Sequence, residues 1–85
     1  MIQFSHKVKD SAGIHARPAG ALIKLVWESG CEVAIKKDGK VADGKKIFTV
    51  MALGVKCGDT VTIEVSGENE KMLAEKIETF MKENL

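Results

Sequence analysis

The chain has 85 residues, and a chain of this length buries only about 60 to 65% of the surface it exposes when unfolded, enough for one thin core. A formal net charge of +1 and 45% hydrophobic residues indicate neither a nucleic-acid-binding footprint nor a disordered tail. No run approaches the roughly 20 apolar residues of a membrane helix, and the first residues lack the apolar core of a signal peptide. We therefore expect one cytoplasmic domain, residues 1–85, that neither inserts into membranes nor binds nucleic acid.

The first half of the chain predicts one strand and one helix. Apolar and polar residues alternate over residues 2–8, which is typical of a strand with one buried side. Gly13 breaks this pattern. Apolar residues then recur at helical spacing over residues 16–27, and Gly30 predicts the end of the helix because glycine adopts a left-handed cap without strain.

The second half continues with the same two periodicities. Asp38-Gly39 predicts a hairpin turn, because both residues tolerate a positive φ. We expect strands at residues 32–36, 40–43 and 60–66, a helix of about two turns ending at Gly54, and a final helix at residues 69–82. The order β-α-β-β-α-β-α favours an α+β fold, with an antiparallel sheet that has helices on one face and solvent on the other.

Three residues with reactive side chains are assigned structural roles. Cys31 and Cys57 are too few for a disulfide scaffold and lack the C-x-x-C spacing of metal or redox sites, so packed or idle thiols are favoured. His6 lies on the buried side of the first strand. We expect it to be a partly buried, hydrogen-bonded histidine rather than a second reactive site.

His15 stands where a helix begins. Proline is favoured in the first turn of a helix, so Pro18 indicates that the helix starts at Ala16 and that His15 lies at or beside its N-cap. Serine, threonine, aspartate and asparagine are the usual caps, and the positive end of the helix dipole repels a protonated imidazole. Fold stability alone therefore does not explain a histidine here.

A phosphoryl group on His15 would reverse this electrostatic balance. The first turn, formed by Ala16, Arg17 and Pro18, presents free backbone N–H groups and the positive end of the dipole, and both favour an anion. Arg17 can reach the same anion with a forked pair of donors. A lone histidine at a helix end is more often an ordinary surface residue, so the spacing alone leaves both interpretations open.

Taken together, the motifs resemble those of the HPr family, the histidine-containing phosphocarriers of the bacterial phosphoenolpyruvate-dependent sugar phosphotransferase system. The resemblance rests on GIHARPA (13–19), the DGK hairpin, KKIFTVMALGV (45–55), GDTVTIEVSG (58–67) and the acidic start of the last helix. It extends over essentially the whole chain without an insertion.

This resemblance implies a stoichiometric carrier rather than an enzyme. His15 would accept a phosphoryl group on Nδ1 from the phosphohistidine of enzyme I and pass it to enzyme II A components, with Arg17 steadying the phosphate. The family fold is an open-faced β-sandwich, a four-stranded antiparallel sheet of order 1-4-2-3 covered on one face by three helices. No metal or other cofactor is implied, and we expect a monomer.

The resemblance also implies a docking surface for partner proteins on the first two helices. The residues that carry over are Gly20, Lys24, Ile47, Phe48 and Met51. Ile47 and Met51 share a helical stripe and could equally be core residues, whereas Phe48 is expected to be exposed. A glycine inside a helix indicates close approach, either of the sheet beneath Gly20 or of a partner.

One departure from the family concerns regulation. Many members carry a kinase-regulated serine at the start of the second helix, and this chain has Lys46 there. The nearest hydroxyl, on Thr49, lies within the helix and is a poor substitute. Our hypothesis is that Lys45 and Lys46 form a basic docking rim with Arg17 and Lys24; two solvated loop lysines are the alternative.

Two other functions are considered. One is a regulatory relative of a nitrogen-related or dihydroxyacetone-kinase branch, which would share the histidine chemistry but have different partners. The other is a small phosphatase with His15 as covalent nucleophile. Hydrolysis would need a general acid or base, and residues 11–24 contain no carboxylate and no second histidine, which disfavours this function.

Overall fold

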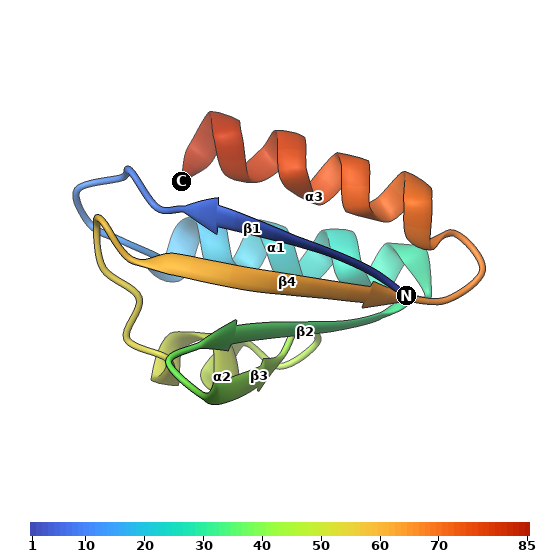
Figure 1. Ribbon diagram of the computed structural model, residues 1–85, viewed down its shortest axis with the longest axis horizontal. Helices are drawn as coiled ribbons and strands as arrows, with labels where there is room; N and C mark the ends of the chain where they lie inside the picture. The colour runs from blue at the N-terminus through green and yellow to red at the C-terminus, as the bar shows by residue number, and fades with distance from the viewer.

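The computed structural model describes residues 1–85. It shows a four-stranded antiparallel sheet with three helices packed against one face (Figure 1). The strands lie in the order β1-β4-β2-β3. The elements are β1 (Ile2–Lys7), α1 (Ala16–Ser29), β2 (Glu32–Lys37), β3 (Lys40–Asp43), α2 (Ile47–Ala52), β4 (Thr60–Ser66) and α3 (Glu70–Asn84). The expected open-faced sandwich and its strand order are confirmed.

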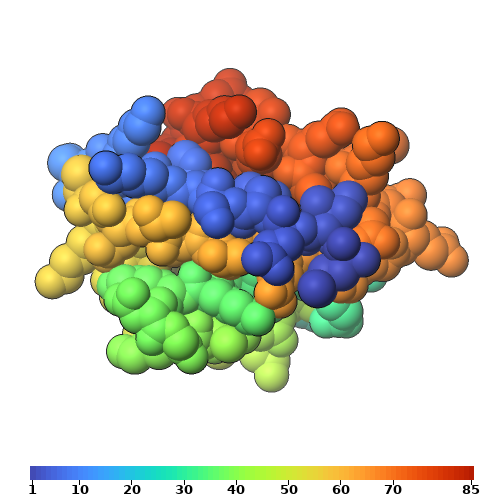
Figure 2. All heavy atoms as spheres, in the orientation of Figure 1, coloured from blue at the N-terminus to red at the C-terminus, as the bar shows by residue number.

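The two faces of the sheet differ as the alternating pattern predicts. On β4, Val61, Ile63 and Val65 are fully buried beneath the helices. The opposite face carries polar residues, among them Lys36 and Glu64, whose side chains pair at 2.8 Å. Figure 2 shows the atoms of β1, β4 and β2 at the surface of this face with no helix above them. The sheet is therefore covered on one side only.

Both long helices extend slightly beyond their predicted bounds. The α1 helix continues to Ser29, whose hydroxyl donates to the carbonyl of Val26 at 2.7 Å and accepts the backbone N–H of Cys31 at 3.0 Å. Gly30 then caps the helix with a φ of 74°, as expected. The α3 helix begins one residue later than predicted and ends at Asn84. Side-chain bonding at the ends of helices, which periodicity does not reveal, accounts for the extension of α1.

The hairpin and the cysteines also agree with the sequence. Asp38 and Gly39 have φ values of 50° and 81°, the geometry that their turn requires. Cys31 is buried, Cys57 is exposed, and both are free thiols. No helix combines the length and the apolar character needed to span a membrane.

His6 differs from its prediction in one respect. Its side chain is half-buried on the helix-covered side of β1, opposite Val61 of β4, as predicted. The buried Nε2 atom has no hydrogen-bond partner, so the expected hydrogen bond at that nitrogen is wrong.

Candidate functional site

His15 is the N-cap residue of α1, as its spacing from Pro18 predicts. Its backbone is extended, with φ −111° and ψ 175°, and its carbonyl accepts the first helical hydrogen bond from the N–H of Ala19 at 3.0 Å. The imidazole makes no capping hydrogen bond and its side chain is 43% exposed. The imidazole is therefore available to a reactant that approaches from solvent.

The first turn of α1 provides donors for an anion beside His15. The N–H groups of Ala16 and Arg17 precede the first helical hydrogen bond and have no partner inside the helix, while Pro18 is buried and has no N–H. The positive end of the 14-residue helix lies at the same place. Arg17 is exposed and lines one open hollow of about 220 Å³ together with His15. This end of α1 suits an anion bound against the imidazole.

The loop that carries His15 is supported by the loop after α2. The N–H of Ile14 donates to the carbonyl of Val55 at 3.2 Å. Gly13 has a φ of 67°, and a Cβ at this position would lie 2.8 Å from Cα of Lys56. Only glycine combines this φ with this close approach of two backbones. The position of His15 therefore depends on the packing of two loops.

Asp59 holds the supporting loop in place. Its Oδ2 atom accepts the backbone N–H of Lys56 at 2.8 Å and lies 2.9 Å from the ammonium of Lys37, which also donates to the carbonyl of Gly54 at 3.1 Å. The hydrogen bond from Lys56, followed by that from Lys37, lowers the pKa of the Asp59 carboxyl below its ordinary value. This carboxylate joins the end of β2 to the loop beneath His15.

A carboxylate lies beside His15, and the expectation that none would do so is wrong. Oδ2 of Asp10 is 3.8 Å from Nε2 of His15. Asp10 precedes residues 11–24, which contain no carboxylate, and the turn between Asp10 and His15 brings the two side chains together. The signal for this contact in the sequence is the tendency of aspartate to start a turn by accepting a backbone hydrogen bond with its own side chain. In the structure, Oδ1 of Asp10 accepts the N–H of Ala12 at 2.8 Å.

The C-terminal end of α3 completes the hollow around His15. Phe80 and Asn84 line it, and the N–H of Asp10 donates to the carbonyl of Leu85 at 3.0 Å. In Figure 1 this end of α3 lies at the same edge of the molecule as the loop between β1 and α1. These contacts join residues more than sixty positions apart, so periodicity could not reveal them.

The predicted docking residues on α1 and α2 differ in exposure. Phe48 is 85% exposed, as expected, and Met51 is 37% exposed, so Met51 belongs to the surface rather than to the core. Ile47 is half-buried and packs against the core. Lys24 and Lys46 are exposed. The sequence left the position of the α2 stripe open, and only Val50 of this helix is buried.

Gly20 makes no close contact inside the molecule. A Cβ added to this half-buried residue would meet no atom within 4 Å, so approach of the sheet does not explain the glycine. The other explanation that the sequence offered, close approach of a partner, stays a prediction.

Lys45 and Lys46 are not equivalent, contrary to the hypothesis that treats them as one rim. The Lys45 ammonium lies 3.2 Å from Oε1 of Glu32 and 5.5 Å from the ring centroid of Trp27, and its side chain is only 21% exposed. Trp27, which the sequence analysis did not single out, is itself 61% exposed beside this pair. Lys46 is therefore the free cation of the two.

The Thr49 hydroxyl is fully engaged. It donates toward the carbonyls of Lys46 at 2.7 Å and Asp43 at 3.0 Å, and it accepts the N–H of Asp43 at 3.0 Å. A kinase would have to break these bonds to reach it. The structure gives a physical reason why Thr49 is a poor replacement for a regulatory serine.

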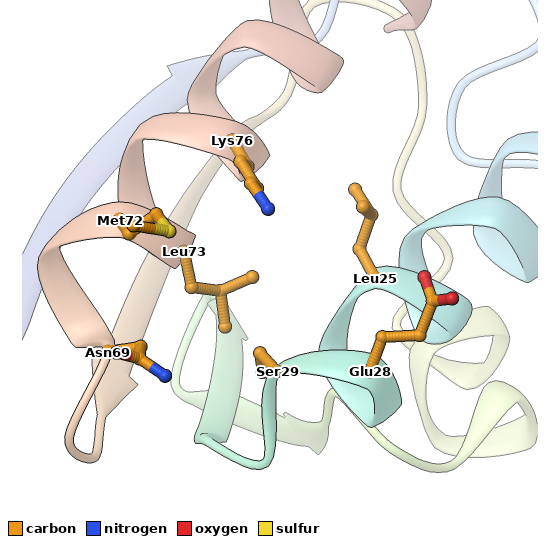
Figure 3. A pocket seen from close by; sticks show the side chains of 7 residues that line it. All are labelled: Leu25, Glu28, Ser29, Asn69, Met72, Leu73 and Lys76. Carbon is orange, nitrogen blue, oxygen red and sulfur yellow. The ribbon is translucent and has the colours of Figure 1, made fainter.

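A second hollow, of about 170 Å³, lies between α1 and α3 far along α1 from His15 (Figure 3). The side chains that point into it are those of Leu25, Glu28, Ser29, Asn69, Met72, Leu73 and Lys76. They include no histidine and no cysteine, and no group of three or more acidic, histidine or cysteine side chains gathers anywhere in the chain to hold a metal ion. The hollow at the start of α1, by contrast, is lined by His15, Asp10 and Arg17.

Fold and site together define an open-faced sandwich whose first helix is capped by an exposed histidine. A family model described as "PTS HPr component phosphorylation site" matches residues 2–83, so the chain belongs to the HPr family. Phosphocarrier protein HPr of Borreliella burgdorferi is 34% identical over 84 residues, which cover 94% of this chain and 98% of the relative. The solved HPr of Thermoanaerobacter tengcongensis has a TM-score of 0.91 at 26% identity, covering 96% of this chain and 92% of that one.

A relative with another name is equally similar in sequence. The structure of the Bacillus subtilis protein Crh is 32% identical, covers 100% of this chain and 98% of its own, and has a TM-score of 0.78. That protein was solved as an intertwined, domain-swapped dimer. Similarity alone therefore identifies the family without separating its branches.

Proposed function

We propose that this protein accepts a phosphoryl group on His15 from phospho-enzyme I and passes it to enzyme II A proteins of the phosphotransferase system. The observation that carries the proposal is the exposed His15 imidazole at the N-cap of α1, beside the free N–H groups of Ala16 and Arg17. We propose that such a carrier works in the cytoplasm, between enzyme I, which takes its phosphoryl group from phosphoenolpyruvate, and enzyme II A, which passes the group on toward the sugar.

The residues around His15 support transfer by positioning and charge. Phosphoryl transfer through a loose, in-line transition state asks a protein mainly to align the reactants and to stabilise negative charge. The free N–H groups at the start of α1 follow His15 directly in the chain, and the exposed Arg17 lines the same hollow as His15, so these donors can stabilise that charge. Neither a metal nor another cofactor is needed, and the protein is a substrate of each transfer rather than a catalyst.

The exposed residues of α1 and α2 support a protein as donor and acceptor. Phe48 and Met51 on α2 supply exposed apolar side chains, and Lys24 on α1 and Lys46 just before α2 supply exposed cations. A small apolar surface with a charged rim is typical of transient interfaces, and basic residues steer acidic partners. We place the docking of both enzyme I and enzyme II A on this surface.

The lack of a carboxylate no longer disfavours the phosphatase function, because Oδ2 of Asp10 lies beside Nε2 of His15. The exposed Phe48 favours the carrier, since hydrolysis of a small ester has no use for an apolar docking surface. Multiple turnovers on a small phosphate ester by the isolated protein would favour the phosphatase, and a single phosphorylation event would favour the carrier.

The regulatory branch and the oligomeric state are questions separate from the transfer chemistry. Lys46 in place of a serine argues against control by a serine kinase, and a regulatory carrier would differ only in its partners. We propose a monomer, as the family resemblance implies, in contrast to the domain-swapped dimer in which the relative Crh was solved. Light scattering coupled to gel filtration distinguishes the two states.

The primary experiment is intact-mass analysis after incubation with phosphoenolpyruvate and a bacterial enzyme I. We expect one acid-labile phosphoryl group on the wild type and on His6→Ala, and none on His15→Ala. Phosphorylation that persists in His15→Ala would overturn the assignment of the site. Failure of folded wild type with a panel of enzyme I proteins would overturn the proposed donor.

A further inference from the structure

Asp10 faces one particular nitrogen of His15. Its Oδ2 atom lies 3.8 Å from Nε2, while Nδ1 is the other nitrogen of the ring. The distance exceeds a hydrogen bond but is within the range of electrostatic attraction between a carboxylate and an N–H, directly or through one water. The two side chains are 31% and 43% exposed, so solvent reduces this attraction without removing it.

The Asp10 carboxylate is held in place independently of His15. Its Oδ1 atom accepts the N–H of Ala12 at 2.8 Å, and its backbone N–H donates to the carbonyl of Leu85 at 3.0 Å. Its own carbonyl accepts the N–H of Gly13 at 2.9 Å. One carboxylate oxygen is therefore used by the turn, and the other is left facing the imidazole.

We propose that Asp10 is a positioning residue that keeps the proton of neutral His15 on Nε2 and so presents the lone pair of Nδ1 to phosphorus. A carboxylate accepts hydrogen bonds and has no proton to donate, so it stabilises the tautomer whose N–H faces it. This inference deepens the proposed function and rests on it, because the lone pair matters only if His15 is phosphorylated.

No other charged group lining the hollow competes for Nε2. Arg17 is the one other charged residue there, and as a cation it cannot accept the imidazole proton. From α3, Phe80 and Asn84 line the hollow, and neither titrates. The backbone N–H groups at the start of α1 are donors and are placed to meet the phosphoryl oxygens.

The transfer step is balanced with the proton on Nε2 throughout. The Nδ1 lone pair forms the new bond to phosphorus as the bond between phosphorus and the donor's histidine nitrogen breaks, and that electron pair returns to the donor nitrogen. In the reverse sense, the electron pair of the Nδ1–P bond returns to Nδ1 as the phosphoryl group leaves. If the ring carries its proton on Nε2, it leaves as a neutral imidazole, which is a better leaving group than an imidazolate anion. Asp10 faces that proton.

The test is the tautomer of His15 in Asp10→Asn, read from the ¹⁵N chemical shifts of the ring at a pH where it is neutral. Asparagine keeps an oxygen that can accept the N–H of Ala12. The group that it then turns toward Nε2 is an uncharged NH₂, which donates hydrogen bonds and does not accept them. We expect the ratio of the Nε2–H to the Nδ1–H tautomer to fall by about twofold to fivefold, the range of one solvent-exposed ion pair. An unchanged ratio in the folded variant would overturn the inference.

Two further variants separate position from charge and stability. Asp38→Asn removes the same charge in the β2–β3 hairpin and is expected to leave the tautomer ratio unchanged. Asp10→Glu retains the carboxylate and is expected to lie closer to the wild-type ratio than Asp10→Asn; a ratio equal to that of Asn would contradict the proposal. Because the ratio is measured without phosphorylation, its outcome is independent of whether enzyme I is the donor.

A kinetic readout completes the test. Under single-turnover conditions with phospho-enzyme I, we expect phosphorylation of Asp10→Asn to be slowed in proportion to the fall in the fraction of His15 in the Nε2–H form, since only that form presents the Nδ1 lone pair. A rate that falls without a change in tautomer would assign Asp10 to docking instead and would overturn the positioning role.

Discussion

The indole N–H of Trp27 donates a hydrogen bond to the backbone carbonyl of Lys45 at 3.0 Å, and the Lys45 ammonium lies 5.5 Å from the centroid of the same indole ring. These two contacts join the last turn of α1 to the segment that enters α2. Glu32 on β2 adds a carboxylate 3.2 Å from the Lys45 ammonium. These contacts therefore link α1 to the segment that leads into α2, the two helices that carry the proposed docking residues.

This arrangement predicts different effects for the two adjacent lysines. Lys46→Gln removes an exposed cation and is expected to slow association with enzyme I at low salt while changing the free energy of unfolding by less than about 0.5 kcal/mol. Lys45→Gln loses the contacts with Trp27 and Glu32 and is expected to destabilise the fold by about 1 kcal/mol. Stopped-flow association at two salt concentrations and urea denaturation measure the two quantities. An equal effect of both substitutions on association would contradict the distinction.

A second prediction concerns Trp27 itself. Trp27→Phe retains an aromatic ring but loses the N–H that bonds to Lys45, so we expect a loss of about 1 kcal/mol in the free energy of unfolding. Circular dichroism during urea denaturation measures this without the tryptophan, which is the only one in the chain. Trp27→Leu removes the ring as well and is expected to cost more; equal stability of wild type and both variants would show that this contact is not stabilising.

Much of this fold could be predicted from short-range patterns. The alternation on β4 and the hairpin at Asp38-Gly39 depend only on neighbouring residues, and both match the structure. The position of His15 at the N-cap was predictable in the same way. Pro18 alone is enough to indicate the first turn of a helix, and His15 stands just before that turn. The strand order was available only from the family resemblance, since nothing local specifies which strand pairs with which.

The parts of the site that the sequence did not reveal are contacts between distant segments. Trp27 meets Lys45 eighteen residues later, and Asp10 shares its hollow with Asn84. The contact between Asp10 and His15 is the local exception: the turn between them is held by the Asp10 side chain bonding to Ala12, and the tendency of aspartate to start such turns was a signal in the sequence. Similarly, the empty space above Gly20 is a property of the packed structure and not of the glycine.

The third prediction concerns Phe48, which is 85% exposed. Phe48→Ala is expected to change the free energy of unfolding by less than about 0.5 kcal/mol, because the ring is already in water. It is expected to weaken docking of enzyme I by about tenfold or more, if the ring lies at the centre of the interface. Calorimetry of binding and urea denaturation separate these effects.

Val50 on the same helix provides the matched control. It is 1% exposed, so Val50→Ala is expected to destabilise the fold by about 2 kcal/mol and to leave the affinity of the folded protein nearly unchanged. If Phe48→Ala left affinity intact, the docking surface would have to lie elsewhere on the molecule.

The fourth prediction uses two glycines with opposite surroundings. Gly20→Ala places a methyl group where no atom lies within 4 Å and is expected to stabilise the helix by about 0.5 to 1 kcal/mol. The same methyl group is expected to weaken docking, because a partner that approaches the glycine closely would meet it. Unchanged affinity would rule out close approach at this position.

Gly13→Ala is expected to have the opposite effect on stability. Its φ of 67° and the nearby backbone of Lys56 leave no room for a Cβ, so we expect a loss of about 1 to 3 kcal/mol. The loop that carries His15 would move with it, and phosphorylation by enzyme I is expected to slow even where the protein stays folded. Single-turnover kinetics below the unfolding temperature measures this.

The last prediction is a pH dependence of stability that comes from Asp59. Hydrogen bonds from Lys56 and Lys37 lower the pKa of its carboxyl below the ordinary value of 3.8. A lowered pKa in the folded state means that the carboxylate stabilises the fold above the pKa it has in the unfolded chain. That contribution is lost as the pH falls from about 3.8 through the lower pKa of the folded state.

Asp59→Asn is therefore expected to be less stable than wild type at neutral pH and to approach it as the pH falls below about 3.8, where protonation removes the charge from the wild-type residue as well. Urea denaturation of both proteins from about pH 7 to about pH 2 gives the difference in free energy of unfolding at each pH. Asp38→Asn serves as control, because its carboxylate takes part in none of the ion pairs of the structure. A difference between wild type and Asp59→Asn that stayed constant across the acid range would mean that the asparagine acts through packing and not through the lost charge.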